Sequence, residues 1–274
     1  METKPGSAGA PIILLTDIGG SDPYSGQIKT VIAALSPDTA VIDLCHDVPA
    51  HNVLVGSMFL KGSWKFSPPG SIHLAVVEKG AEGAARPLAI MAHDRYFVGP
   101  DNGILWPIVR DAENWKGVVV ENPDMMLEEV HATFHSRDIY APIAAHLANG
   151  VPIEKMGNPI NDIVKLDKPV PEMVDHRIHG RIIFIDHFGN AWTNITSKYL
   201  TEHGWLDRPG DIIVNVASCK VKGLRKSYVT ESLNKPIAII NSFDLVEIAW
   251  PGESAEKKMR LWEGVWVDMI LSGK

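Results

Sequence analysis

The feature that most limits the fold of this chain is a repeated pairing of a short apolar run with a stretch of helical spacing. Residues 11–17 form an apolar run that ends in an acid, and residues 26–37 then carry apolar side chains at helical spacing. The same pairing returns at residues 39–48 and 52–66, and a third apolar run follows at residues 71–80. Buried strands that alternate with helices pack into an α/β layer around a largely parallel sheet.

A change of pattern after the first half of the chain predicts a second domain. Residues 161–177 contain prolines and little periodicity, which is typical of a linker, and short apolar strands between turns follow them. We predict an α/β N-terminal domain with a mostly parallel sheet over residues 11–160. We also predict a smaller all-β, barrel-like C-terminal domain over residues 178–274. Within the first domain, residues 87–105 are expected to hold two antiparallel strands.

Composition and missing motifs exclude several classes of protein. The formal net charge is −7, whereas nucleic-acid-binding proteins usually carry a basic patch, so we expect no nucleic-acid partner. No stretch approaches the roughly 20 apolar residues of a membrane span, and the first ten residues lack the apolar core of a signal peptide. We therefore expect a cytoplasmic protein without a membrane partner. The two cysteines are too few and too far apart for a zinc motif, and no HExxH, P-loop or dinucleotide fingerprint occurs, so we predict no metal site.

Polar residues stand near the ends of the predicted strands. Asp17 ends the first apolar run, His51 follows the second and Glu78 lies at the end of the third. In open α/β sheets, ligands bind at the carboxyl ends of the strands. Two glycines after Asp17 would let a ligand approach the backbone, and the carboxylate suits ribose hydroxyls. An acid that only braces its loop fits the same pattern equally well.

Two later segments concentrate polar and aromatic side chains. In TFHSRDIYAP, His135 and Ser136 stand just before a predicted helix, where anion or nucleophile handling and simple N-capping both fit. In IDHFGNAWTNI, aromatic rings alternate with Asp186 and Asn190. That pattern suits a planar heterocycle, and it also suits a tight strand turn with a packed tryptophan.

The loop in AVVEKGAEGAARPLA, residues 75–89, raises a separate question. It leaves an apolar strand and carries Glu78 and the lone arginine Arg86. These two residues are either half of an active site or the remnant of one.

Six ordered segments together resemble one known family, the S-adenosyl-L-methionine (SAM) hydroxide adenosyltransferases, which also includes the SAM-dependent fluorinase and chlorinase. The segments are TDIGGSDPYSGQIK, IDLCHDVPAHNV, FVGPDNGIL, TFHSRDIYAP, IDHFGNAWTNI and IINSFDLVEIA. The resemblance implies a homotrimer in which the N-terminal domain of one subunit and the C-terminal domain of its neighbour hold SAM. It implies displacement at C5′ of SAM with release of methionine. Water as the nucleophile gives adenosine, and halide gives a 5′-halo-adenosine.

The resemblance also implies roles for particular residues. Asp17 is expected to hold the ribose hydroxyls, and Asp186 and Ser242 are expected to contact the methionine end. Tyr228 matches an aromatic residue that covers the adenine. The full set of substrate-binding residues that the resemblance implies is Asp17, His51, Phe134, Ser136, Asp186, Phe188, Asn190, Trp192, Tyr228 and Ser242.

The chain departs from the family in the loop that handles water. The family loop reads VDPGVGTxRRP, and it supplies the Asp and Arg of an Asp–Arg–His set whose His matches His135. Here the loop reads VEKGAEGAARP, so Glu78 replaces the Asp, Ala85 replaces the first arginine and Arg86 matches the second. Ser136 replaces a glycine, and the fluorinase has a serine there that contacts the halide.

From these features we predict hydrolysis of SAM to adenosine and methionine, with His135, Glu78 and Arg86 as the catalytic residues. No cofactor is expected, because SAM is the substrate. Two alternatives stay open. Ser136 is the observation that favours a halide adenosyltransferase, and Ala85 favours a SAM- or adenosine-binding protein with impaired catalysis.

Overall fold

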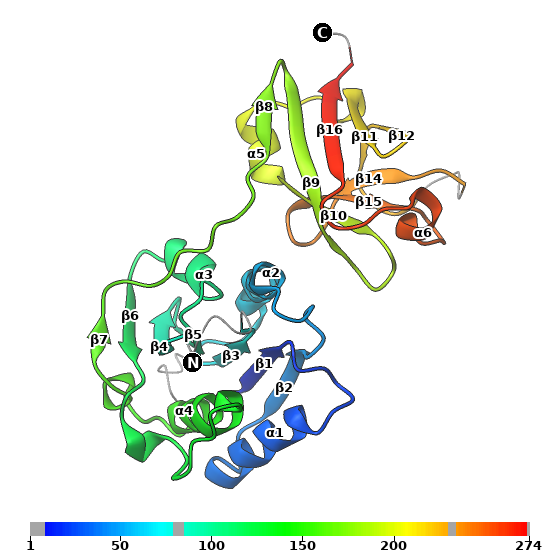
Figure 1. Cartoon of the computed structure of the whole chain (residues 1–274). Coiled ribbons are helices and arrows are strands. Elements are labelled where there is room, and N and C mark those ends of the chain that lie inside the picture. The colour runs from blue at the N-terminus through cyan, green and yellow to red at the C-terminus, as the bar shows by residue number, and fades with distance from the viewer. Residues whose placement is uncertain (1–8, 79–84, 230–233, 273–274) are drawn as a thin grey trace. The chain divides into compact units, whose positions relative to one another are not determined.

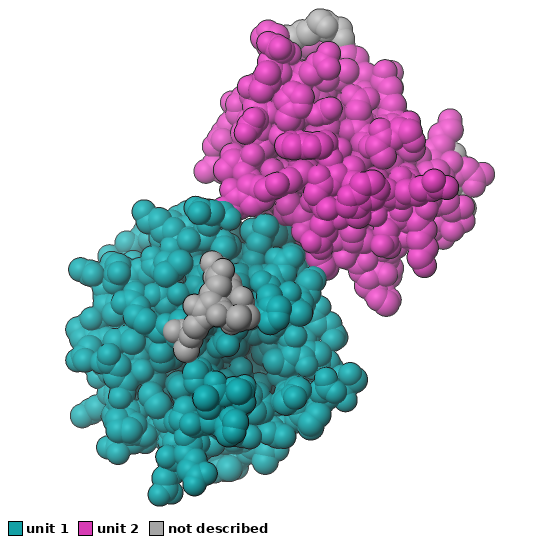
Figure 2. Space-filling model, viewed as in Figure 1, with its two compact units in different colours: residues 1–167 teal, residues 168–274 magenta. Residues whose placement is uncertain are grey.

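The computed structural model describes residues 9–78, 85–229 and 234–272. The chain forms two compact units, residues 1–167 and residues 168–274 (Figures 1 and 2). Each unit has its own hydrophobic core, so each is described by itself.

The first unit is built on a seven-stranded mixed sheet with the order β2-β1-β3-β5-β4-β6-β7. The pairs β2-β1, β1-β3 and β3-β5 are parallel, and the pairs β5-β4, β4-β6 and β6-β7 are antiparallel. The strands are β1 (Ile12–Thr16), β2 (Val41–Cys45), β3 (Ile72–Val76), β4 (Pro87–Ala92), β5 (Arg95–Pro100), β6 (Trp115–Val119) and β7 (Pro159–Ile160).

The prediction of a mostly parallel sheet is therefore confirmed for only half of the pairings. The expected antiparallel pair is confirmed as β4 and β5, which two residues join. Those residues, His93 and Asp94, have φ angles of 51° and 57°. A two-residue turn of this hand matches the twist of a hairpin and can join only antiparallel strands. Beyond β5, the strands β4, β6 and β7 alternate in direction.

Helices cover both faces of this sheet. Helices α1 and α4 pack against each other on one face, and α2 and α3 lie together on the other (Figure 1). All five residues of β1 are buried, as a strand covered on both faces requires. The helical elements are α1 (Tyr24–Leu35), α2 (Val53–Ser63), α3 (Trp106–Arg110), α4 (Ala141–Ala148), a π-helical turn (Ser136–Tyr140) and 3-10 turns at Trp64–Phe66, Pro123–Met125 and Ile153–Lys155.

The second unit is a nine-stranded, nearly closed sheet, which agrees with the predicted barrel-like fold. Its order is β12-β11-β16-β9-β10-β15-β14-β13, and β8 pairs with β9. Strands β12 and β14 contact each other, which brings the two arms of the sheet together. The strands are β8 (Glu172–Val174), β9 (Arg177–Ile185), β10 (Ala191–Thr196), β11 (Ile212–Val216), β12 (Cys219–Lys222), β13 (Leu224–Arg225), β14 (Ile237–Ile240), β15 (Leu245–Ala249) and β16 (Trp266–Leu271).

Short helices interrupt the strands of this unit, so it is not purely β. Helix α5 (Ser197–Glu202) begins at Thr196, whose side chain accepts from the Tyr199 N–H, and α6 (Ala255–Met259) begins in the same way at Ser254. These side-chain caps satisfy N–H groups that have no partner in the first turn of a helix. A further 3-10 turn covers Pro209–Asp211. Over the part of the chain that the structure describes, none of the helices has the length and apolar character to cross a bilayer.

Candidate functional site

A cleft of about 560 Å³ opens in the first unit at the carboxyl ends of β1 and β3. It brings together five residues that the sequence singled out, namely Asp17, His51, Glu78, Phe134 and Ser136. The position agrees with the rule that α/β sheets bind ligands beyond the carboxyl ends of their strands. The other residues that line the cleft are Ile18, Tyr24, Gln27, Val76, His131, Thr133 and Arg137.

Asp17 is fixed by the backbone of the loop that follows β2. Its Oδ2 accepts from the His51 N–H at 2.9 Å. The loops after β1 and β2 are further tied by a hydrogen bond of 2.8 Å from the Gly19 N–H to the carbonyl of His46. The His46 ring lies 2.8 Å from the Thr16 hydroxyl, directly before Asp17 in the chain. The carboxylate therefore has a fixed place at the cleft wall, and none of the described residues makes a hydrogen bond to its second oxygen.

His51 is held at two points beside Glu78. Its Nδ1 lies 2.8 Å from the carbonyl oxygen of Glu78, and its backbone N–H donates to Asp17. His51 also has a φ of 64°, in the left-handed region that few residues other than glycine and asparagine adopt. Behind Glu78, the amide of Asn102 donates to the carbonyl of Val77 at 2.7 Å and fixes the end of the strand.

Arg137 and Phe134 line the cleft from the segment that precedes α4. The guanidinium of Arg137 donates from Nε and Nη2 to both carboxylate oxygens of Asp138, at 2.5 and 3.0 Å, and stacks over the Phe134 ring at 4.8 Å. Burial raises the pKa of Asp138, and hydrogen bonds from Arg137 and from the His131 backbone lower it. The second effect is larger, so the net pKa is below its ordinary value. Phe134 also packs edge-on against Tyr24. The ion pair is structural and anchors this wall.

His135 stands in the sequence between Phe134 and Ser136, which line the cleft, but it is not itself one of the lining residues. It is half-buried and precedes the π-helical turn, whose first residue, Ser136, is buried. Neither residue caps the turn with its side chain, so the N-capping interpretation does not describe them. Among the described residues, the His135 ring has no hydrogen-bond or ion-pair partner, which leaves it available for a ligand or a water.

Arg86 lies in a different environment from the cleft. Its Nε and Nη2 donate to Oδ2 of Asp101 at 2.9 and 2.6 Å, and the Asp101 side chain is only 3% exposed. Oδ1 of Asp101 accepts from the Val164 N–H at 2.7 Å. The hydrogen bond to Asp101 raises the pKa of Arg86. Arg86 is not one of the residues that line the cleft, and residues 79–84, the middle of its loop, lie outside the described residues.

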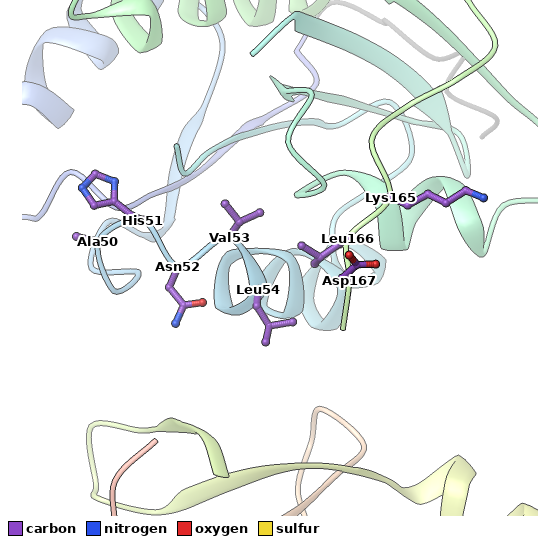
Figure 3. Close-up of a pocket in the computed structure, with 8 residues that line it drawn as sticks. All are labelled: Ala50, His51, Asn52, Val53, Leu54, Lys165, Leu166 and Asp167. Carbon is purple, nitrogen blue, oxygen red and sulfur yellow. The ribbon is translucent and has the colours of Figure 1, made fainter. Parts of the chain in front are cut away.

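A second depression of about 610 Å³ shares His51 with the cleft. It is lined by residues 50–54, which lead into the first turn of α2, and by residues 165–167 (Figure 3). Asn52 begins α2 by accepting from the Val55 N–H at 3.1 Å. His51 is exposed and lines both depressions.

In the second unit, Asp186 organises a tight turn. Its Oδ1 accepts from the N–H groups of Phe188 and Asn190 at 2.9 and 2.8 Å, and its Oδ2 accepts from the Asn190 amide at 3.1 Å. Gly189 in this turn has a φ of 80°, and a Cβ there would overlap Ser254, so only glycine fits. The turn leaves the Phe188 ring 74% exposed. An exposed aromatic ring on a rigid turn is well placed to stack on a ligand.

Next to this turn, a buried acid joins three residues of the second unit. Glu247 on β15 lies opposite Trp192 on β10 and is 1% exposed. It accepts from the hydroxyl of Tyr228 at 2.8 Å and from the amide of Asn241 at 3.1 Å. Burial raises the pKa of Glu247 although these hydrogen bonds oppose the change. Burial also raises the pKa of Tyr228, and its bond to Glu247 adds to this effect.

The remaining predicted residue of this unit, Ser242, lies exposed on the turn between β14 and β15. The Asn241 side chain supports that turn by accepting from the N–H groups of Phe243 and Leu245 at 3.0 and 3.1 Å. Phe243 packs at 4.7 Å from Trp192. Tyr228, Trp192 and the Ser242 turn are thus connected through Glu247 and its neighbours.

Sequence reasoning missed several residues of these sites. Tyr24 and Gln27 line the cleft from the first turns of α1, and Glu247 supports the second unit from inside a strand. A charged residue within the apolar stretch LVEIA was the available signal for Glu247, because an acid is rarely buried without partners. Across the described ranges, no group of three or more His, Cys, Asp or Glu side chains is arranged to hold a metal ion.

Comparison with known families covers both units. A family model described as the SAM hydroxide adenosyltransferase N-terminal domain matches residues 12–157. The model of the corresponding C-terminal domain matches residues 180–268. The two matches fall on different units and together span most of the chain.

Individual relatives agree with this assignment. The chain is 30% identical over 269 residues to an (R)-S-adenosyl-L-methionine hydrolase of Thermus thermophilus, an alignment that covers 95% of this chain and 99% of the relative. It is 29% identical over 222 residues to a fluorinase of Nocardia brasiliensis, with 71% and 74% covered. A crystal structure of an uncharacterized conserved protein from Thermotoga maritima superposes with a TM-score of 0.85 at 28% identity, with 94% and 99% covered.

Proposed function

Because the chain belongs to the SAM hydroxide adenosyltransferase family, we propose that it hydrolyses S-adenosyl-L-methionine to adenosine and L-methionine. The observation that carries the proposal is the meeting of Asp17, Glu78 and Ser136 in one cleft at the carboxyl ends of β1 and β3. Residues far apart in the sequence meet where a ligand of an α/β sheet binds.

The chemistry needs little beyond a positioned water. The sulfonium of SAM leaves as a neutral thioether, so the leaving group requires no proton. Water is a weak nucleophile, so the protein has to hold it in line with the C5′–S bond and accept its proton. Glu78 and His135 are the proposed groups for these tasks. We propose that the reaction uses no cofactor, since the substrate itself carries the activated carbon.

The binding roles follow the chemistry of each side chain. The fixed carboxylate of Asp17 suits the ribose hydroxyls as an acceptor of two hydrogen bonds. In the second unit, Phe188 and Tyr228 offer ring faces for adenine. Asp186 and Ser242 offer polar atoms for the methionine ammonium and carboxylate. His51, Phe134, Asn190 and Trp192 complete the proposed contacts.

We propose a cytoplasmic homotrimer in which the first unit of one subunit and the second unit of its neighbour hold one SAM molecule. The division of the proposed contacts between two separately folded units supports this arrangement. Analytical ultracentrifugation of the purified chain measures the assembly. Three times the mass of one chain is the expected result, and a monomer contradicts it.

Incubation with SAM tests the proposed activity. Chromatography should show adenosine and methionine released in equal amounts, faster than the spontaneous decay of SAM. The variant Glu78→Gln should lower kcat by about 100-fold, since it keeps the size of the side chain but removes its charge. Adenosine at the background rate with the wild-type protein would disprove the proposal.

A halide adenosyltransferase is the second candidate, and Ser136 is the observation that favours it. This buried serine lines the cleft. Glu78 lines the same cleft, and a carboxylate there disfavours an incoming anion by charge repulsion. We therefore expect no 5′-halo-adenosine when SAM is supplied with chloride or fluoride. Formation of that product would make the halide reaction the better description.

A further inference from the structure

We propose that His51 is a catalytic base of this site, which takes the proton of the attacking water on Nε2 while Glu78 and His135 hold that water in line with C5′. The inference rests on the proposed hydrolysis and names a residue that had been assigned only to substrate binding. It follows from the hydrogen bonds that hold His51, from its exposure to the cleft and from the residues that the water-handling loop lacks.

The tautomer of His51 is set by its neighbour. Its Nδ1 lies 2.8 Å from the carbonyl oxygen of Glu78. A carbonyl oxygen can only accept, so Nδ1 must carry the hydrogen and donate it. In the neutral ring, Nε2 then holds a free lone pair. Among the described residues none makes a hydrogen bond to this Nε2, so it is available to a water molecule.

The backbone of His51 is held in place as well. The His51 N–H donates to Asp17, and the residue has a φ of 64°. A left-handed conformation is unfavourable for most residues, and it persists where the surroundings hold it. His51 lines the cleft together with Asp17 and Glu78. A base that is held in place needs no reorganisation when the water attacks.

His51 offers a polar group at a site where the loop of residues 75–89 has lost an arginine. Ala85 has no group that can orient water, and Arg86 donates to the buried Asp101 instead of lining the cleft. The charged groups that line the cleft with His51 are Asp17, Glu78 and Arg137, with His131 as a further titratable group. Lys165 and Asp167 line the adjoining depression. Of these groups, the cation Arg137 is already paired with Asp138.

The step is balanced without a further reactant. The water oxygen forms a bond to C5′ of SAM, and the C5′–S bond breaks with its electron pair going to sulfur. The sulfonium becomes the neutral thioether of methionine, and one water proton moves to Nε2 of His51. The imidazolium then releases this proton to solvent. The net reaction converts SAM and water into adenosine, methionine and one proton.

Two variants of His51 separate the role in catalysis from the role in structure. In His51→Asn, the amide can still donate to the Glu78 carbonyl, and asparagine tolerates the left-handed backbone, but no base remains. In His51→Gly, the backbone is again allowed and the space of the ring becomes free for added imidazole. The matched control is His203→Asn in the second unit, because the Nδ1 of His203 also lies 2.8 Å from a backbone carbonyl.

Steady-state kinetics with SAM give the decisive readouts. We expect His51→Asn to lower kcat by at least 100-fold with little change in KM. Added imidazole should restore the rate of His51→Gly in a saturable manner, and His203→Asn should match the wild type. A kcat of His51→Asn within about threefold of the wild type overturns the proposal, and so does a His51→Gly variant that imidazole fails to restore. A wild-type protein that releases no adenosine would instead overturn the proposed hydrolysis itself.

Discussion

Replacing Arg86 with alanine should destabilise the first unit while leaving catalysis nearly unchanged. The guanidinium is 45% exposed, but the Asp101 side chain that accepts from it is 3% exposed. Removing the arginine therefore leaves a buried carboxylate that, among the described residues, accepts only from the Val164 N–H.

The size of the loss lies between two limits. Exposed ion pairs contribute about 0.2–1 kcal/mol, and breaking a fully buried pair costs about 3–5 kcal/mol. Since one partner is exposed and the other is buried, we expect Arg86→Ala to cost about 2 kcal/mol in the free energy of unfolding. For a unit of this size the corresponding fall in Tm is about 4–8 °C.

Denaturant unfolding and SAM kinetics on the same preparations test this expectation. The matched control is Arg110→Ala, because Arg110 is 43% exposed and pairs with Asp111, whose side chain is 41% exposed. That variant should lose less than about 0.5 kcal/mol. Adding Asp101→Asn to Arg86→Ala should recover part of the loss, since it removes the unpaired charge.

A different outcome would refute the structural interpretation of Arg86. If Arg86→Ala kept the stability of the wild type and lost kcat by 100-fold or more, Arg86 would be a catalytic residue, as the sequence pattern predicts. The argument from the Asp101 hydrogen bonds would then be wrong.

Three further predictions address binding and stability. Asp17→Asn should raise the KM for SAM by about 10–100-fold with a smaller change in kcat, as measured by initial-rate kinetics. The reason is that the amide keeps an acceptor for the His51 N–H but loses the charge that binds the ribose hydroxyls. Tyr228→Phe should raise KM roughly fivefold, because the ring stays but the hydroxyl no longer donates to the buried Glu247; an unchanged KM would contradict it. Burial lowers the pKa of His73 from 6.5 to about 4, so the unfolded chain binds more protons between these values and stability falls as pH decreases through this window. The loss should reach about 3 kcal/mol in urea titrations from pH 7 to pH 4, and His73→Gln should remove this part of the pH dependence.

The sequence predicted the elements of the first unit better than their directions. Apolar runs at helical or strand spacing identify β1, α1 and the hairpin of β4 and β5, because local burial fixes their periodicity. The directions of β6 and β7 are set by the strands next to which they pair, β4 and β6, and these pairs form at the sheet edge that the hairpin creates. Such a choice is made by packing between distant segments, and local patterns do not record it.

The same limit applies to the candidate site. The polar residues at strand ends that line the cleft, Asp17 and Glu78, follow from the general geometry of parallel strands. The partner of Arg86 does not, since Asp101 lies 15 residues further on and becomes adjacent only through the pairing of Pro87 with Pro100. Glu247 was likewise hidden, because its partners come from a different loop and a different turn.

The central claim is that water attacks C5′ of SAM, and an oxygen-18 label tests it most directly. SAM is incubated with the protein in labelled water, and the products are measured by mass spectrometry. The account predicts one labelled oxygen in the 5′-hydroxyl of adenosine and no label in methionine. Adenosine without the label, or no adenosine above the spontaneous background, would contradict it.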